Sequence, residues 1–157
     1  MAASALRHHA NTVSNLQKWP NAFKIHILDA IALIDSSLAD LAKNALPYMR
    51  WGGADLRGER LPKDLSNAMP FCELIGPNGM FYDKNVRVGL WMQSPGIVYG
   101  PRSHAAEETF YILSGKAIWW NEDNGYRSLG RCEYVFHRSN VEHTSTTKES
   151  HVMAIWR

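Results

Sequence analysis

Apolar residues recur every three or four positions between residues 21 and 48, which is the spacing of one face of an α-helix. Ser36 and Ser37 interrupt this pattern and predict two helices, with Ser37 capping the second. Pro47 ends the helical region. We expect the apolar face to pack against the rest of the chain, although a contact between two copies stays open. The positions that define this face are Phe23, Ile27, Ala30, Ile31, Ile34, Leu38, Leu41, Ala42 and Ala45.

The pattern changes after residue 50. Trp51 to Pro70 carries glycines, prolines and charges and predicts a long loop, either a lid or a plain linker. From Phe71 onward, short β-forming runs alternate with turn signals such as GPNG at 76–79 and NEDNG at 121–125. Such spacing predicts a mainly β, antiparallel fold that is closed or double-layered. The predicted strands are Phe71–Ile75, Val86–Gln93, Ile97–Tyr99, Thr109–Leu113, Ala117–Asn121, Tyr126–Ser128, Glu133–His137 and His151–Trp156.

Length and charge narrow the function classes. The 157 residues correspond to one domain, and a formal net charge of +2 without a basic stripe argues against nucleic-acid binding. No run approaches the roughly 18 apolar residues of a membrane span, and the first residues lack the apolar core of a secretory signal. Cys72 and Cys132 have no metal-binding spacing, and a disulfide between them has no support. We therefore expect a cytoplasmic protein that binds no membrane.

One stretch, YGPRSHAAEETFYILSG from Tyr99 to Gly115, carries candidate chemistry. Strand alternation places His104 and Glu108 on the same face as the core residues Phe110 and Ile112. A carboxylate on an inward face needs a partner or a cation. His143 begins the last β region, on a strand that can lie beside the one carrying His104. Two imidazoles and a carboxylate suit a divalent first-row metal, although a hydrogen-bonded core histidine is the alternative.

The chain resembles the cupins, and among them the cupin-type dimethylsulfoniopropionate (DMSP) lyases. The resemblance rests on LIGPNGMFYDKNVRVGLWMQSPGIVYG, RSHAAEETFYILSGKAIWW and VEH at 141–143. It implies one domain over 1–157, in which a helical segment at about 10–50 precedes a cupin-type double-stranded β-helix (jelly-roll barrel) at about 70–157. The family motif H-x-H-x-x-x-E and a later His imply that His104, Glu108 and His143 bind one divalent metal ion: Zn, Fe, Mn, Ni or Co.

The chain departs from the family at two positions. Arg102 replaces the first histidine of the motif, and Phe110 replaces a functional tyrosine, whereas Tyr99 matches the other family tyrosine. Tyr111 is adjacent, but alternation sends it to the opposite face. Arg102 cannot ligate a metal, but it can hold a carboxylate. The alternative for Arg102 is an ion pair with Glu107 or Glu108.

The resemblance implies a β-elimination that converts DMSP into dimethyl sulfide and acrylate. Tyr99 would be the base and Arg102 a ligand of the substrate carboxylate, although a free phenol, with a pKa of roughly 10, is a weak base at neutral pH. Aromatic faces would hold the sulfonium by cation–π attraction. The candidates for this wall are Trp91, Phe110 and Trp119, with Trp120, Tyr82 and Phe136 as further possibilities.

Two other function classes stay open, because a fold does not determine a function. One is a metal-dependent cupin dioxygenase or isomerase, and the other is a cupin that binds a small ligand without catalysis. A small carboxylate is the expected partner in the lyase hypothesis, and a homodimer is compatible with the sequence. Among the remaining histidines, His137 could donate a hydrogen bond that supports the metal site, but we expect it to be exposed at a strand end. We expect His8, His9, His26 and His151 to lie at the surface without partners.

Overall fold

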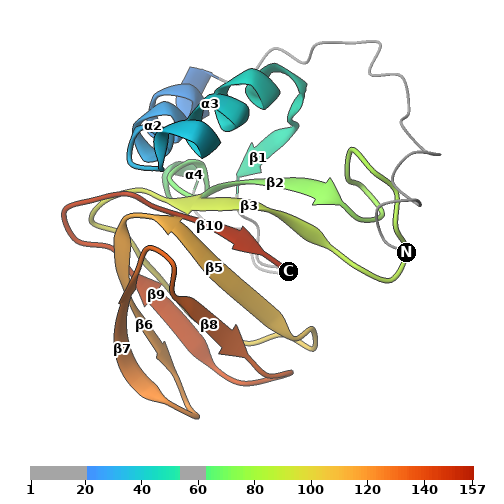
Figure 1. Ribbon diagram of the computed structural model, residues 1–157. Coiled ribbons are helices and arrows are strands. Elements are labelled where there is room, and N and C mark those ends of the chain that lie inside the picture. The colour runs from blue at the N-terminus through green and yellow to red at the C-terminus, as the bar shows by residue number, and fades with distance from the viewer. Residues whose placement is uncertain (1–20, 54–62) are drawn as a thin grey trace.

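The computed structural model describes residues 21–53 and 63–157. Two antiparallel sheets face each other: a six-stranded sheet in the order β1-β2-β3-β10-β5-β8 and a four-stranded sheet in the order β4-β9-β6-β7 (Figure 1). This arrangement confirms the predicted double-sheet barrel with helices before it. The strands are β1 Trp51–Gly53, β2 Pro70–Ile75, β3 Val88–Gln93, β4 Val98–Arg102, β5 Glu108–Ser114, β6 Lys116–Asn121, β7 Gly125–Gly130, β8 Tyr134–His137, β9 His143–Thr146 and β10 Val152–Trp156.

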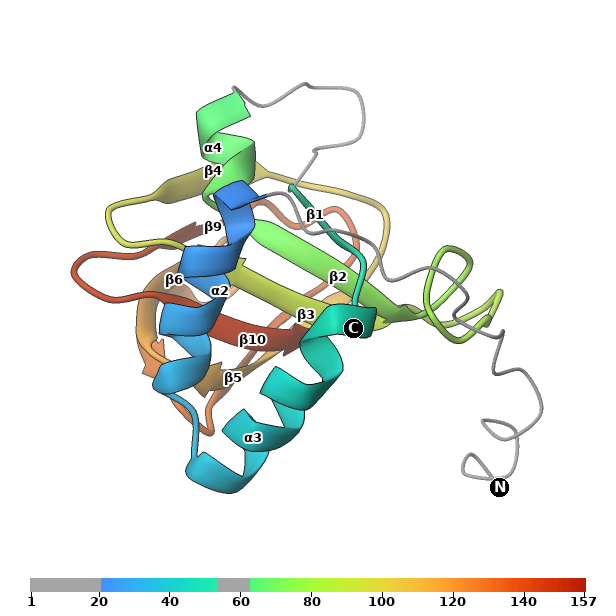
Figure 2. The same cartoon turned by 90° about the horizontal axis from the view of Figure 1, so that it is seen from above.

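Two hydrophobic cores share the six-stranded sheet. The first lies between that sheet and the helices that cover its outer face (Figure 2). Leu90, Met92 and Met153 pack there against helical residues. The second lies inside the barrel, where Trp91 and Ala154 point the other way. Alternation along β3 and β10 sends successive side chains into opposite cores, so these central strands are buried on both faces. The barrel interior is therefore closed on its helical side, and β3 contributes an aromatic side chain to it.

The helical prediction is confirmed in outline and corrected in detail. Helix α2 (Asn21–Ala32) buries Ile27 and Ile31, as the apolar spacing predicts. Helix α3 (Ser36–Ala45) is capped by Asp35, whose carboxylate accepts a hydrogen bond from the Ser37 backbone N–H, so Ser37 is not the cap. The short 3₁₀ helix η1 (Leu46–Tyr48) follows and contains Pro47.

Helix α3 presents a different face from the predicted one. Ala39 and the following Leu46 are buried, whereas Leu38 and Leu41 are 41% and 67% exposed. The small Ala39 side chain lets the helix lie close to its neighbours, and the larger leucines point outward. The prediction of Leu38 and Leu41 as core residues is therefore wrong.

The predicted loop from Trp51 to Pro70 is only partly a loop. Trp51–Gly53 pairs with β2 as strand β1, and Lys63–Asn67 forms the short helix α4. Trp51 is buried in the helical core, which explains why a residue in a glycine-rich stretch is held in place. Residues 54–62 and the terminal residues 1–20 lie outside the described part of the chain.

The two cysteines are both free thiols, Cys72 buried and Cys132 exposed. The disulfide considered between them does not form. Within the described residues, no helix is long and apolar enough to cross a membrane.

Candidate metal centre

Three elements bring the predicted ligands together at one end of the barrel. Glu108 is the first residue of β5, and His143 is the first residue of β9, where it pairs with Arg102 of β4. His104 lies in the 103–107 loop between β4 and β5. The backbone N–H of Asn140 donates to the His104 carbonyl at 2.7 Å, so this loop is fixed to the turn that leads into β9. All three side chains are therefore positioned by paired or anchored backbone.

A glycine permits this close approach of β4 to β9. Gly100 has a φ of +121°, in the region that favours glycine. A Cβ placed there would lie 2.8 Å from the His143 carbonyl oxygen. Any larger residue at this position would push β4 away from the strand that carries His143.

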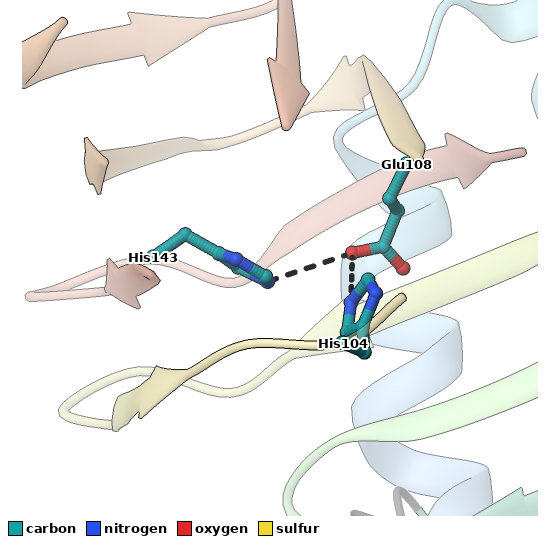
Figure 3. Close-up of side chains that lie close together, drawn as sticks. All are labelled: His104, Glu108 and His143. Atoms are coloured by element: carbon teal, nitrogen blue, oxygen red, sulfur yellow. Dashed lines mark ion pairs between the residues drawn. The ribbon is translucent and has the colours of Figure 1, made fainter. Parts of the chain in front are cut away.

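The three side chains converge on one point (Figure 3). Glu108 Oε2 lies 3.4 Å from His104 Nε2 and 3.8 Å from His143 Nε2. One ligand atom from each residue lies within 4.8 Å of the others. Metal–ligand distances are about 2.0–2.2 Å for nitrogen and oxygen, so ligands of one ion at a tetrahedral angle are about 3.4 Å apart. The observed separations fit three ligands around a shared cation.

The hydrogen bonds of the two imidazoles define which nitrogen faces that point. His104 Nδ1 lies 2.9 Å from the Ala106 carbonyl oxygen, and His143 Nδ1 lies 2.8 Å from the Val141 carbonyl oxygen. Because a carbonyl only accepts, both Nδ1 atoms carry the proton of the neutral ring. Each Nε2 therefore presents a lone pair to the carboxylate.

When both imidazoles are neutral, as metal binding requires, three electron-rich atoms face one another without a donor between them. Glu108 Oε2 and His143 Nε2 are buried, and neither has a hydrogen-bond partner among the described residues. Buried polar atoms normally have partners, and a carboxylate is costly to bury without a cation. A divalent ion would satisfy all three atoms at once, so the residues present fit a metal site.

The local charges favour the ligating forms of two of these groups. Burial and then the nearby Arg102 cation lower the pKa of His143 to about 4. Burial raises the pKa of Glu108, but the hydrogen-bonding His104 and the charge of Arg102 outweigh it, and the net shift is downward. At neutral pH His143 is therefore neutral and Glu108 ionised, as metal binding requires. The Glu108 carboxylate accepts a hydrogen bond from protonated His104 Nε2 and so raises the pKa of His104 above its usual value, and a metal ion would displace that proton.

Acid should destabilise the metal-free protein. The unfolded chain binds protons at His143 and His137 below pH of about 6.5, whereas the folded pKa values are about 4 and about 3. The unfolded state therefore binds more protons between pH 6.5 and 4, so these two groups lower stability as pH falls. His104 opposes them, because its raised pKa gives stability that is lost only as pH rises. We expect chelator-treated protein to lose on the order of 1–2 kcal/mol between pH 7 and 5, measured by urea unfolding. If the urea midpoint of the chelator-treated protein is the same at pH 7 and pH 5, the lowered pKa values of His143 and His137 are wrong.

Arg102 lies buried beside Tyr99 rather than in an ion pair. One guanidinium nitrogen donates to the Tyr99 carbonyl oxygen at 3.0 Å, and the guanidinium carbon lies 3.8 Å from the centroid of the Tyr99 ring. Within the described residues, no carboxylate oxygen of Glu107 or Glu108 lies within 4.0 Å of it. The ion-pair alternative is therefore wrong. The positive charge still acts on Glu108 and His143 from a distance.

Aromatic side chains line the barrel next to the triad. The rings of Trp91, Phe110 and Trp119 form a mutual cluster with centroids 5.0 to 5.7 Å apart, and all three are buried. Tyr82 and Phe136, also considered for this wall, are 62% and 41% exposed and do not belong to the buried cluster. Tyr111 is 42% exposed, as strand alternation predicts, so it does not replace the missing hydroxyl of Phe110.

The preferred prediction for one histidine of this region is wrong, because solvent exposure was favoured over a supporting role at the metal site. His137, predicted to be exposed, has no exposed surface and stacks on His143 with ring centroids 4.1 Å apart and an interplanar angle of 13°. It shares a face with the buried Val135, and this alternation along β8 was the available signal. Burial and then the charge of His143 lower its pKa to about 3.

His26 and His151 also have a partner, which is each other. Their ring nitrogens lie 3.4 Å apart where helix α2 meets the segment before β10, and both residues are half-buried. The expectation of partnerless surface histidines is wrong for this pair.

The family profile of dimethylsulfoniopropionate lyase matches residues 4–154 of the chain. The dimethylsulfoniopropionate lyase DddQ of Ruegeria pomeroyi is 32% identical over 103 residues, which cover 64% of this chain and 51% of DddQ. The chain therefore spans about half the length of this relative.

Two solved structures have the same fold. A crystal structure of DMSP lyase DddQ from Ruegeria pomeroyi has a TM-score of 0.75 and 23% identity, covering 91% of this chain and 74% of that one. A chain from the crystal structures of the DMSP lyases RdDddP and RnDddQII has a TM-score of 0.75 and 22% identity, covering 99% and 86%. At this identity the likeness establishes the fold.

Proposed function

The chain belongs to the dimethylsulfoniopropionate lyase family, and on that premise we propose that it is a carbon–sulfur lyase that cleaves DMSP to dimethyl sulfide and acrylate. The observation that carries the proposal is the set of three facing lone pairs on His104, Glu108 and His143, inside a barrel lined by aromatic rings and one buried cation. A metal-dependent β-elimination needs a Lewis acid, a base and a place for the sulfonium. The chain offers candidates for all three.

His104, Glu108 and His143 would hold one divalent ion. That ion supplies Lewis-acid stabilisation of the negative charge that develops on the substrate carboxylate. Two imidazoles and one carboxylate accept Zn, Fe, Mn, Ni or Co, and the donor set does not choose among them.

Tyr99 is the base in this proposal. Its phenolate takes the proton from the carbon next to the carboxylate, and the electrons of that C–H bond form the carbon–carbon double bond. The carbon–sulfur bond breaks with its electron pair on sulfur, so neutral dimethyl sulfide leaves and acrylate remains. The Arg102 guanidinium over the Tyr99 ring stabilises the phenolate, because a cation 3.8 Å from the ring centroid attracts the negative charge. Phe110 carries no hydroxyl, so proton transfer depends on Tyr99 alone of the two motif positions.

Arg102 also orients the substrate. The guanidinium is buried, and one of its nitrogens donates to a backbone carbonyl. Its planar fork suits a carboxylate, which would supply the negative charge that a buried cation requires. With the carboxylate held there, the sulfonium would lie against Trp91, Phe110 and Trp119, whose faces attract a cation. The same apolar rings exclude water from the departing sulfide.

The direct test is headspace detection of dimethyl sulfide from metal-loaded protein and DMSP. We expect release that chelation abolishes and that Tyr99→Phe lowers by about 100-fold or more, the usual contribution of a general base. Tyr126→Phe, at an exposed position on β7, is the matched control and should leave the rate unchanged. No release with any of the five metals, or Fe(II)-dependent oxygen uptake in its place, would refute the lyase proposal.

A further inference from the structure

Three histidines gather at this end of the barrel, but their hydrogen bonds assign them two different roles. His104 and His143 donate Nδ1–H to backbone carbonyls and present bare Nε2 atoms to Glu108. The third, His137, stacks on His143 and is paired in register with Glu108 across β5 and β8. Directly opposite residues on neighbouring strands point to the same face, so His137 and Glu108 project to the same side of the sheet.

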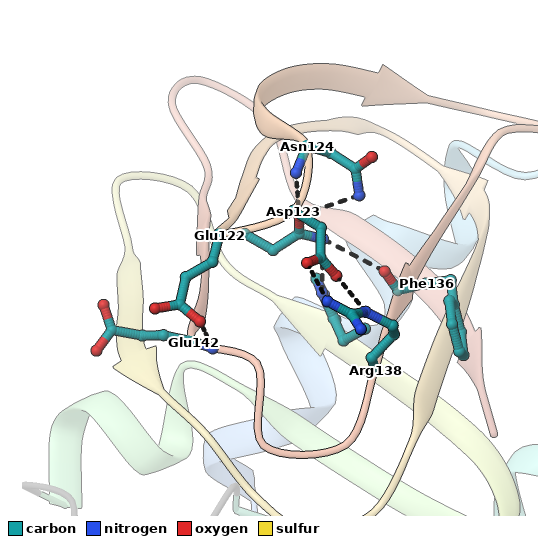
Figure 4. Close-up of polar contacts among 8 residues, drawn as sticks. Glu122, Asp123, Asn124, Phe136, Arg138 and Glu142 are labelled. Carbon is teal, nitrogen blue, oxygen red and sulfur yellow. Dashed lines mark hydrogen bonds and ion pairs between the residues drawn. The ribbon is translucent and has the colours of Figure 1, made fainter.

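An asparagine determines the tautomer of His137. Asn121 Nδ2 lies 3.2 Å from His137 Nδ1 and 3.3 Å from the Phe136 carbonyl oxygen. Asn121 Oδ1 accepts two hydrogen bonds from Asn124, one from the backbone N–H at 2.8 Å and one from the side-chain amide at 3.1 Å. Figure 4 shows Asn124 and Phe136 among the polar contacts of this region. These contacts fix the orientation of the Asn121 amide. Its nitrogen must face the Phe136 carbonyl oxygen, which only accepts, and its oxygen must face the two N–H donors of Asn124.

The proton of His137 is consequently on Nε2. An amide nitrogen only donates, so Nδ1 of His137 must accept and cannot carry a proton. A protonated, doubly donating imidazolium would place two donors against each other. The neutral ring then carries its single hydrogen on Nε2, the opposite tautomer from that of His104 and His143. An N–H group cannot ligate a metal, so His137 is excluded as a fourth ligand although it stacks on one.

This Nε2–H is a buried donor without an acceptor in the protein. No described residue accepts from it, and the same holds for Nε1–H of Trp119, whose ring centroid lies 6.1 Å from that of His137. A buried unsatisfied donor costs about 1–3 kcal/mol, so where the protein supplies no acceptor the partner is an ordered water or a bound ligand. The acceptor must enter the barrel beside Glu108 and the aromatic cluster.

We propose that His137 Nε2–H donates a hydrogen bond to the carboxylate of the bound substrate, with Asn121 holding the imidazole in the donating tautomer. The inference deepens the proposed function and rests on it for the identity of the carboxylate. Because a carboxylate has two oxygens and several lone pairs, it can accept from His137 while it also contacts Arg102. His137 is therefore a substrate-binding residue, and Asn121 is its positioning residue.

Acrylate is the probe for this role, with binding to zinc-loaded protein measured by calorimetry. His137→Leu should weaken acrylate binding roughly 10- to 100-fold, the effect of losing a hydrogen bond to a charged acceptor. His137→Gln, whose amide N–H reaches a similar position, should stay within about threefold of the unchanged protein. Zinc content should remain the same in both variants. Equal acrylate affinity in His137→Leu, or loss of zinc from it, would overturn the proposal.

The tautomer is tested by NMR, first in the unchanged protein and then in one variant of Asn121. Long-range proton–nitrogen spectra of ¹⁵N-labelled zinc-loaded protein should show His137 protonated at Nε2 and His104 and His143 protonated at Nδ1. Asn121→Asp, which replaces the donor by an acceptor, should move the His137 proton to Nδ1 and weaken acrylate binding to the extent seen in His137→Leu. A His137 proton on Nδ1 in the unchanged protein would refute the inference. Acrylate binding that behaves as expected in protein that releases no dimethyl sulfide would instead refute only the proposed reaction.

Discussion

His104→Ala is expected to lower the metal affinity of the protein by at least about 100-fold, since residues that merely support a ligand already contribute 10- to 100-fold. The loss removes one of three lone pairs and leaves Glu108 Oε2 with His143 alone, 3.8 Å away. His104 is also the most accessible of the three, with 35% of its side chain exposed, so its truncation leaves the barrel core intact. Elemental analysis after dialysis against a chelator of known affinity measures the effect.

The matched control is His26→Ala, which removes a half-buried imidazole from helix α2, outside the triad. Its metal content should equal that of the unchanged protein. Dimethyl sulfide release should fall in proportion to metal content in His104→Ala and remain unaltered in His26→Ala. If His104→Ala retains full occupancy, the three side chains are not the ligand set.

The regular part of the site could be predicted from the sequence. Glu108, Phe110 and Ile112 lie on one continuous strand, where a period of two applies without interruption, and all three point inward as expected. The antiparallel double sheet likewise follows from short strands and strong turn signals. These predictions succeed because they depend only on the two-residue alternation of side chains along a strand and on local turn sequences.

The irregular part could not be predicted by counting. Strand alternation predicted that His104 points inward, but His104 lies in a loop where alternation does not apply. Its side chain reaches the triad because the loop is anchored to Asn140. Tyr99 and Arg102 have opposite parity, yet both are buried and in contact, because the register of β4 against β9 shifts between them. Such a register shift changes the direction in which side chains point, and it can be recognised only once the partner strand is known.

Polar residues in the barrel were the other source of error. In the sequence, His137 stands at a predicted strand end followed by the polar residues RSN, and nothing there indicates that Asn121, 16 positions earlier, lies beside its imidazole. Satisfied buried polar groups depend on tertiary partners, which a hydrophobic pattern does not encode. The same applies to α3, where neighbouring packing, and not apolar spacing, decided that Ala39 rather than Leu41 is buried.

Arg102→Met is expected to raise the KM for DMSP roughly 10- to 100-fold while metal content stays constant. A hydrogen bond to a charged group contributes about 1.5–3 kcal/mol, which corresponds to this range. Arg102→Lys keeps the charge but not the planar fork, so it should recover only part of the loss. Arg87→Met, which removes a surface arginine paired with Glu73, is the matched control and should leave KM unchanged.

Thermal unfolding separates this role from a structural one. A buried guanidinium without a carboxylate within 4.0 Å among the described residues contributes little net stability, because its desolvation is not compensated by an ion pair. Methionine fills a similar volume without that cost, so the midpoint of Arg102→Met should be equal to or above that of the unchanged protein. A variant that binds acrylate normally but melts at a much lower temperature would show that Arg102 serves the fold. An Arg102→Met variant that melts normally but binds acrylate weakly would show that the Arg102 guanidinium binds the substrate carboxylate.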